Sequence, residues 1–300
     1  MFELNNDNYY SLDADRQYMS CSQFQSFMAC EAAAIAKLRG IFTPEHVSDA
    51  LVQGNYFHTA LESEEAHKAF CDDHFDEIYK TKETKSRGIE IIGKYAPYER
   101  LDEMLRVART DSVINKFIEM SGENEKFMTG EIGGIEWRIR VDKYIPTSRR
   151  IIDYKTTADI YKLTYSSEAK EYQSFIEEYG YMMRAAVYGE IERQFTGNDK
   201  FPSFLIIAVS KQDPPDKGIF LLNDEARWTF EIENIMEKLP RIISLKKGAE
   251  NPKRCGMCEY CRKTKIIKRI KLYTDLMPQF RNDPDNVEYD DYDGKDIFTV

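Results

Sequence analysis

The fold of this chain is decided by residues 126–157, KFMTGEIGGIEWRIRVDKYIPTSRRIIDYKTT, in which apolar and polar residues alternate over three runs. Lys126 to Ile132 and Ile135 to Ile145 are expected to form two strands joined by a tight turn at Gly133-Gly134. Ile151 to Thr156 is expected to form a third strand, because two isoleucines at its start would anchor it in a core. The stretch therefore predicts a meander of strands in the middle of the chain.

Two acids and a lysine lie on these strands. Asp142 ends the run Trp137 to Val141, and Asp153 and Lys155 lie on the next strand. This spacing suits neighbouring antiparallel strands, and two residues that are two apart project from one face. Two carboxylates can hold Mg²⁺, and a lysine can offset the charge that develops on a phosphate. The pattern favours a metal-dependent phosphodiesterase, although D-x-K by itself is more typical of a surface ion pair.

The rest of the chain predicts helices around a sheet. Helices are expected over 23–38, 56–69, 98–120, 168–195 and 224–247, further strands over 203–210 and 218–222, and a polar loop over 80–88. This order is typical of the α/β (α+β) class, with a central mixed β-sheet flanked by helices. We expect a single domain over 1–280, made of a helical part (18–120), a catalytic core (126–222) and C-terminal helices with a cysteine cluster (223–275).

Charge is unevenly placed along the chain. The net charge is −10, but basic residues dominate between Lys246 and Lys271, and a flexible acidic tail is expected over 281–300. The basic segment is compatible with DNA as a partner, and equally with a solvated helix face. No apolar run is long enough to span a membrane and no secretory signal is present, so a cytoplasmic protein without a membrane partner is expected.

Three further motifs follow the same order as in a known family. They are Ser20–Phe24 (SCSQF), Gly54–Glu62 (GNYFHTALE) and Tyr181–Tyr188 (YMMRAAVY). With Arg140–Asp142 and Ile152–Thr157, they make residues 18–265 resemble the PD-(D/E)XK nuclease superfamily. Within it, the chain resembles the RecB/RecE-like (exodeoxyribonuclease VIII-like) exonucleases of phages and bacteria. The resemblance implies a restriction-endonuclease-like core with helical N- and C-terminal additions.

The resemblance also implies roles for individual residues. Mg²⁺ or Mn²⁺ would be held by His58, Asp142, Asp153 and the backbone carbonyl of Tyr154. Lys155 would position or activate the attacking water, and Glu131 could reach a second metal. Substrate contacts are expected from Arg140, Arg184 and Tyr188. Arg184 stands where the family usually has a glutamine, and an arginine there could grip a phosphate.

Cysteines near the C-terminus have metal-ligand spacing. Cys255, Cys258 and Cys261 are spaced C-x₂-C-x₂-C, which supplies three of the four ligands of a metal site. Some RecB-like nucleases hold a [4Fe–4S] cluster with one N-terminal and three C-terminal cysteines, and Cys30 lies at the position resembling the N-terminal ligand. The tight spacing departs from those families, so a [4Fe–4S] cluster, Zn²⁺ and free thiols all stay open.

The function implied is a DNA exonuclease acting at DNA ends, in phage-type recombination alongside a single-strand annealing protein. Such exonucleases can form rings, so a homo-oligomer stays open. One alternative is a CRISPR-associated RecB-like or structure-specific endonuclease with an iron–sulfur cluster. An alternative of another class is a non-catalytic DNA-binding module, which would have no need of the acids and the lysine.

Overall fold

The structure is a computed structural model of the chain, and it describes residues 4–5, 7–45, 49–84, 88–167, 169–267 and 273. Among these residues, no helix combines the length and the apolar character that crossing a bilayer requires. The expected acidic tail, 281–300, lies outside the described residues.

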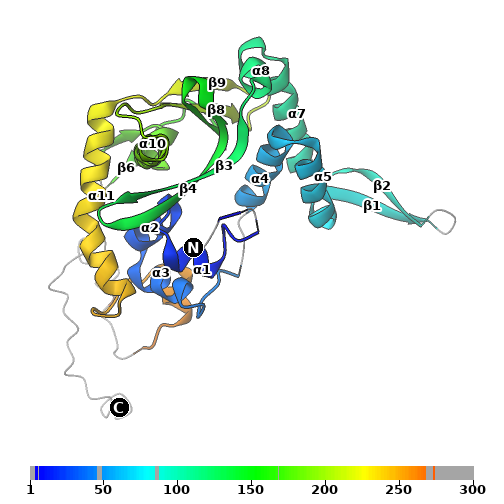
Figure 1. The fold of residues 1–300 in the computed structure, drawn as a ribbon. Coiled ribbons are helices and arrows are strands. Elements are labelled where there is room, and N and C mark those ends of the chain that lie inside the picture. Colours follow the sequence, from blue (N-terminus) through cyan, green and yellow to red (C-terminus); the bar gives the residue numbers. More distant parts are fainter. Residues whose placement is uncertain are drawn as a thin grey trace, which may run out of the picture.

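A five-stranded mixed sheet forms the centre of the molecule (Figure 1). Its strands, in spatial order, are β3 (Glu123–Ile132), β4 (Ile135–Ile145), β5 (Arg150–Thr157), β8 (Ser203–Ser210) and β9 (Lys217–Leu221). The pair β5–β8 is parallel and the other three pairs are antiparallel. The predicted meander over β3, β4 and β5 and the mixed sheet are therefore confirmed.

Strict alternation along the central strands gives the sheet two buried faces. Ile151, Phe204 and Ile206 enter one hydrophobic cluster, whereas Ile152 and Leu205 enter the other. The first face is covered by α2 (Cys21–Ala29), α3 (Glu31–Leu38), α10 (Tyr181–Thr196) and α11 (Glu225–Lys246). The second is covered by α4 (Asp49–Glu62), α7 (Ala96–Thr110) and α8 (Ser112–Glu119). Helices thus flank both faces of the sheet, as predicted.

The structure corrects four of the expected helices. Those expected over 56–69 and 98–120 are each divided in two, at Ser63 and at Asp111. Residues 23–38 form two helices, which are interrupted at Cys30. The helix expected from residue 168 begins only at Tyr181, because Gly180 is in the left-handed region with φ 68°. Before it lie the short elements β6 (Thr164–Ser166), β7 (Glu171–Gln173) and α9 (Phe175–Glu178).

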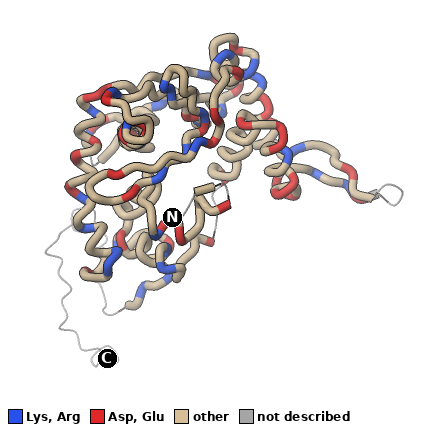
Figure 2. The backbone as a smooth tube through the Cα atoms, in the orientation of Figure 1, with Lys and Arg blue, Asp and Glu red and all other residues tan. Residues whose placement is uncertain are grey.

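A β-hairpin replaces the loop expected over 80–88. It is made of β1 (Tyr79–Thr84) and β2 (Gly88–Lys94), and it follows α5 (Glu64–Asp73) and α6 (Phe75–Ile78). The hairpin projects from the helical part of the molecule (Figure 1), and Figure 2 shows basic and acidic residues interspersed along it. The polar composition of β1 concealed it in the sequence. In β2, three isoleucines are present, and all three are exposed: Ile89, Ile91 and Ile92. The remaining elements are α1 (Leu12–Gln17), the 3₁₀ turn η1 (Pro146–Ser148) and α12 (Glu259–Lys263).

Packing between α10 and α11 leads to a prediction about stability. A Cβ atom added at Gly189 would lie 2.5 Å from Cζ3 of the fully buried Trp228. We expect Gly189→Ala to lower the free energy of unfolding by about 1–3 kcal/mol, because the indole must shift in a filled core. Gly54→Ala is the matched control: a Cβ atom there meets nothing within 4 Å, and alanine favours a helix by up to about 1 kcal/mol. Urea unfolding of both variants measures this. An equal gain in the free energy of unfolding for the two variants would contradict the prediction.

Candidate active site

The candidate site lies where β4 and β5 separate. Their last paired residues are Lys143 and Ile152, so the next residues along, Asp142 and Asp153, stand at the opening between the strands. The backbone N–H of Tyr154 donates to Oδ2 of Asp142 at 2.8 Å instead of to the backbone of β4. The carboxylate of Asp142 is thereby held against β5.

Three oxygen atoms converge on one point beside this opening. The ammonium nitrogen of Lys155 lies 2.6 Å from Oδ2 of Asp153, 2.9 Å from the carbonyl oxygen of Tyr154 and 3.9 Å from Oδ2 of Asp142. The carboxylate of Asp153 is only 3% exposed, and that of Asp142 is 15% exposed. Buried carboxylates need a positive partner. The arrangement therefore presents oxygen ligands to a cation from two neighbouring strands.

His58 comes to the same place from helix α4. Its neighbours Tyr56 and Phe57 are fully buried in the second hydrophobic cluster and fix this helix against the sheet. Nδ1 of His58 lies 3.2 Å from Oδ2 of Asp142. Burial of Asp142 acts to raise its pKa. That effect is outweighed by the positive charges of His58 and Lys155 and by hydrogen bonds, so the pKa of Asp142 lies well below its usual value.

The donor set fits a divalent cation. Two carboxylates and a backbone carbonyl are the oxygen ligands that Mg²⁺ and Mn²⁺ prefer, and one imidazole can complete such a set. Their convergence on the ammonium group of Lys155 shows that a positive charge is accommodated at this point. The five groups expected here, those of His58, Asp142, Asp153, Tyr154 and Lys155, are brought together by the structure.

Two further acids face this site and were missed in the sequence. Glu62 follows His58 by one helical turn, and the i, i+4 spacing could have revealed it. Glu125 lies across from Asp142 in a bulge of β3, with φ 52°, between the pairs Asn124–Lys143 and Lys126–Val141. Burial, and then the charge of Asp142, raise the pKa of Glu125 to about 7, and the same two causes raise the pKa of Glu62. Burial thus disfavours the charged form of both carboxyl groups, and a positive charge bound nearby would oppose that effect.

Glu131 is not part of this site. It pairs with Glu136 near the turn of the β3–β4 hairpin, at the opposite end from Asp142, and its side chain is exposed. Its backbone N–H donates to the side-chain oxygen of Gln194 at 2.8 Å. The expectation of a second-metal role for Glu131 is corrected, because it pointed to the wrong acid of the same strand: Glu125 occupies the position near Asp142.

The three expected substrate-binding residues lie on the side of the site formed by α10 and β4. Nη1 of Arg184 is 3.7 Å from Oδ1 of Asp153, and its guanidinium lies over the rings of Tyr181 and Tyr188. Arg140 contacts Glu125, and 22% of its side chain is exposed. The Tyr188 hydroxyl is buried and donates to the carbonyl oxygen of Arg140 at 3.1 Å. Arg140 and Arg184 can therefore meet a phosphate, whereas Tyr188 supports them from within the core.

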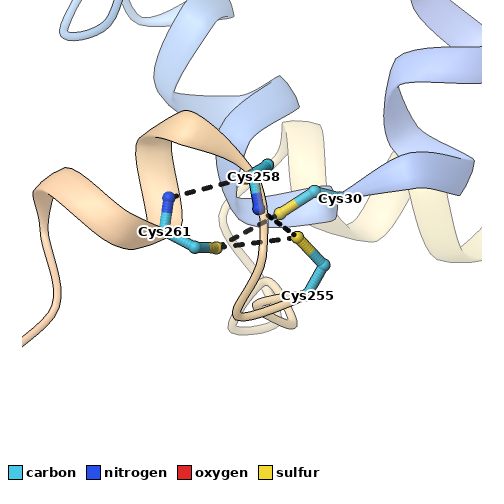
Figure 3. A group of neighbouring side chains, drawn as sticks. All are labelled: Cys30, Cys255, Cys258 and Cys261. Carbon is cyan, nitrogen blue, oxygen red and sulfur yellow. Dashed lines mark hydrogen bonds between the residues drawn. The ribbon is translucent and has the colours of Figure 1, made fainter.

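The four expected cysteine ligands also come together, away from this site (Figure 3). The sulfur atoms of Cys30, Cys255, Cys258 and Cys261, hereafter the cysteine tetrad, all lie within 4.8 Å of one another. Cys30 comes from the junction of α2 and α3, and the other three come from the segment around α12. The predicted cysteine cluster is confirmed.

Comparisons with known proteins agree with this geometry. The model of a family described as a PDDEXK-like domain of unknown function (DUF3799) matches residues 20–264. A crystal structure of a "Putative exonuclease" from Eubacterium rectale is 30% identical in sequence and superposes with a TM-score of 0.81. The match covers 93% of this chain and 99% of that chain.

Two other comparisons add nothing to the assignment. The crystal structure of SSO0001 is 14% identical, and the match covers 80% of this chain and 91% of that chain with a TM-score of 0.26, which is too low to support an argument. No curated protein matches the sequence significantly.

Proposed function

The chain belongs to the PDDEXK-like family DUF3799, and from that membership we propose that it is a divalent-metal-dependent exonuclease that hydrolyses DNA from its ends. The fold and the likeness to a protein named as an exonuclease support a nuclease. The observation that carries the proposal is the convergence of Asp142, Asp153 and the Tyr154 carbonyl on the ammonium group of Lys155. A DNA-binding module without activity would have no use for buried acids at such a point.

We assign the metal ligands from this donor set. Asp142, Asp153, His58 and the carbonyl oxygen of Tyr154 would hold Mg²⁺ or Mn²⁺. When bound, such an ion lowers the pKa of a coordinated water and polarises the phosphate. The backbone N–H of Tyr154 fixes the orientation of the Asp142 carboxylate, and the sheet fixes that of Asp153. The ligands are thus held in place before any ion arrives, which limits the reorganisation that binding requires.

Lys155 is the residue that we assign to the reacting phosphate. Hydrolysis joins a water oxygen to phosphorus and breaks one P–O ester bond, and negative charge grows on the phosphate oxygens on the way. In this structure the ammonium group contacts Asp153 and the Tyr154 carbonyl. With an ion held by those oxygens, it would lie beside them, next to the charge on the phosphate, and would offset that charge. Its N–H groups can also orient the attacking water by hydrogen bonding.

Arg184 leads to a prediction about substrate binding. The guanidinium is already neutralised in part by Asp153, and its exposed fraction of 28% leaves it accessible to a phosphate. Arg184→Ala is expected to lower kcat/KM by about 10–100-fold, the effect of losing one charge-assisted hydrogen bond. Arg184→Lys should recover part of that loss, because it restores the charge without the bidentate geometry. Steady-state kinetics on an end-labelled duplex measure both, and wild-type kinetics for Arg184→Ala would exclude the contact.

The biological setting is part of the same proposal and rests on the resemblance alone. An exonuclease of this kind would act in phage-type recombination, where it would expose single strands for an annealing protein. Assembly into a homo-oligomer would fit that role.

The proposal is tested by digestion of end-labelled linear DNA and of the same DNA as a covalently closed circle. We expect Mg²⁺ or Mn²⁺ to support release of nucleotides from the linear DNA, and EDTA to abolish it. Cutting of the circle would mean that the protein is an endonuclease and not an exonuclease. No hydrolysis of either substrate in the presence of both metals would overturn the nuclease itself.

A further inference from the structure

The cysteine tetrad is built from two segments that are more than two hundred residues apart in the sequence. Cys30 and Cys261 are 6% and 2% exposed, and Cys255 and Cys258 are half-buried. All four are free cysteines. The Cys30–Cys261 and Cys255–Cys261 sulfur distances are 3.7 Å and 3.9 Å, nearly twice the length of a disulfide bond, about 2.05 Å. The tetrad is therefore an assembly of thiol groups around a common centre (Figure 3).

These distances discriminate between the metals that four thiolates can bind. Zinc–sulfur bonds of about 2.3 Å in a regular tetrahedron place neighbouring sulfurs about 3.8 Å apart, and the two distances lie on either side of that value. A [4Fe–4S] cluster is much larger, because each cysteine binds a separate iron and the iron and sulfide atoms lie between the thiolates. Four sulfurs within 4.8 Å of one another would have to move apart to admit such a cluster, whereas a single ion fits between them as they lie.

The backbone around the tetrad is arranged for thiolates. The N–H groups of Cys258 and Cys261 donate to the sulfurs of Cys255 and Cys258 at 3.3 Å and 3.4 Å. Four thiolates around a divalent ion carry two net negative charges, and hydrogen bonds to the sulfurs help to disperse them. Arg254 and Arg262 brace the same loop through the carbonyl oxygens of Cys261 and Met257, and their positive charges oppose the remaining negative charge.

A second, independent observation is the break between α2 and α3. Residues 23–38 contain no glycine or proline and predict one continuous helix. The structure interrupts this helix at Cys30, whose φ of −166° and ψ of 105° are extended, and the Cys30 side chain makes no capping hydrogen bond. Instead, the N–H of Ala32 donates to the carbonyl of Lys253, in the segment that carries the other three cysteines. The break orients the Cys30 thiol toward the other three cysteines of the tetrad. The helix is therefore interrupted where a fourth ligand is needed.

We propose that the cysteine tetrad binds one tetrahedral Zn²⁺ ion in place of an iron–sulfur cluster, and that this ion holds the α2–α3 junction to the segment around α12. The proposal does not depend on the nuclease activity. Zinc in a four-cysteine site has no open coordination position, and its role is structural. Because α2 also packs against α10, which carries Arg184, the ion steadies one wall of the candidate active site from a distance.

The metal content of the full-length protein tests this inference. We expect about one zinc per chain, no iron or acid-labile sulfide and no visible absorption, in protein purified with and without oxygen. Cys258→Ser should lose the zinc, whereas Cys71→Ser should keep it, since Cys71 is buried in the other hydrophobic cluster. Iron in the wild-type protein, as a single ion or as a cluster, would overturn the proposal, and so would equal zinc in both variants.

A measurement on the unmodified chain covers the case in which Cys258→Ser does not fold. Zinc is removed by a chelator, and the alkylation of cysteines is followed before and after. We expect four thiols to become reactive on removal and to be protected again by added Zn²⁺. Co²⁺ added instead should give the absorption of a tetrahedral thiolate site. Thiols that react equally with and without zinc would contradict the inference.

Discussion

Replacing Lys155 by alanine is expected to lower the rate of DNA hydrolysis by about 10²–10⁴-fold while the fold is retained. The ammonium group contacts Asp153 and the carbonyl of Tyr154, so its loss removes the positive charge that would meet the phosphate. Single-turnover hydrolysis of an end-labelled duplex at saturating Mg²⁺ measures the effect on the chemical step. Circular dichroism of the variant checks that the sheet is intact.

Lys200→Ala is the matched control for this variant. Lys200 is exposed and lies between α10 and β8, away from the site. The Lys200→Ala variant loses the same charge as Lys155→Ala. Its rate of DNA hydrolysis should stay within a factor of about two of the wild-type rate. Full activity in Lys155→Ala would mean that the residue assigned to the reacting phosphate has no such role.

Asp142→Asn is expected to abolish tight binding of Mn²⁺ and to lower activity by about 10³-fold or more, since a bound ion contributes several kcal/mol to the reaction. Asparagine can still accept the hydrogen bond that the N–H of Tyr154 donates to Asp142. The change therefore removes a charge and a metal ligand with little effect on the geometry of β5. Calorimetric titration with Mn²⁺ and the hydrolysis assay measure the two effects separately.

Asp199→Asn provides the comparison for this second variant, because Asp199 is exposed beyond the end of α10. Its metal affinity and activity should match those of wild type. If Asp142→Asn bound Mn²⁺ as tightly as wild type, the ligand assignment would fail even with the activity reduced.

The parts of the site that the sequence predicted are those governed by local rules. Asp142, Asp153 and Lys155 lie on regular strands, where a period of two fixes which side chains share a face. His58, in contrast, was predicted from the resemblance of the motif Gly54–Glu62 to a known family, and a local rule alone would not have assigned it. Their meeting at one point still required the pairing of β4 with β5, which the short connection between the two strands made predictable.

The parts that the sequence did not reveal depend on irregular backbone or on tertiary contacts. Glu125 reaches the site through a β-bulge, and an extra residue in a strand changes which side chains face which side. For that reason, alternation along β3 gave no indication of Glu125. The interruption at Cys30 could not be predicted for a different reason. Helix propensity is high on both sides of Cys30, and contacts with a segment over two hundred residues away override it.

The central claim is that Asp142, Asp153, His58 and the Tyr154 carbonyl hold the ion used for hydrolysis. It is tested most directly by a crystal of the protein soaked in Mn²⁺, with the anomalous signal of the ion mapped. The account predicts a peak among these four groups, about 2.0–2.4 Å from the carboxylate oxygens, and its absence in Asp142→Asn. A wild-type protein that hydrolyses DNA with Mn²⁺ but shows no peak there, or shows it at another set of residues, would contradict the account.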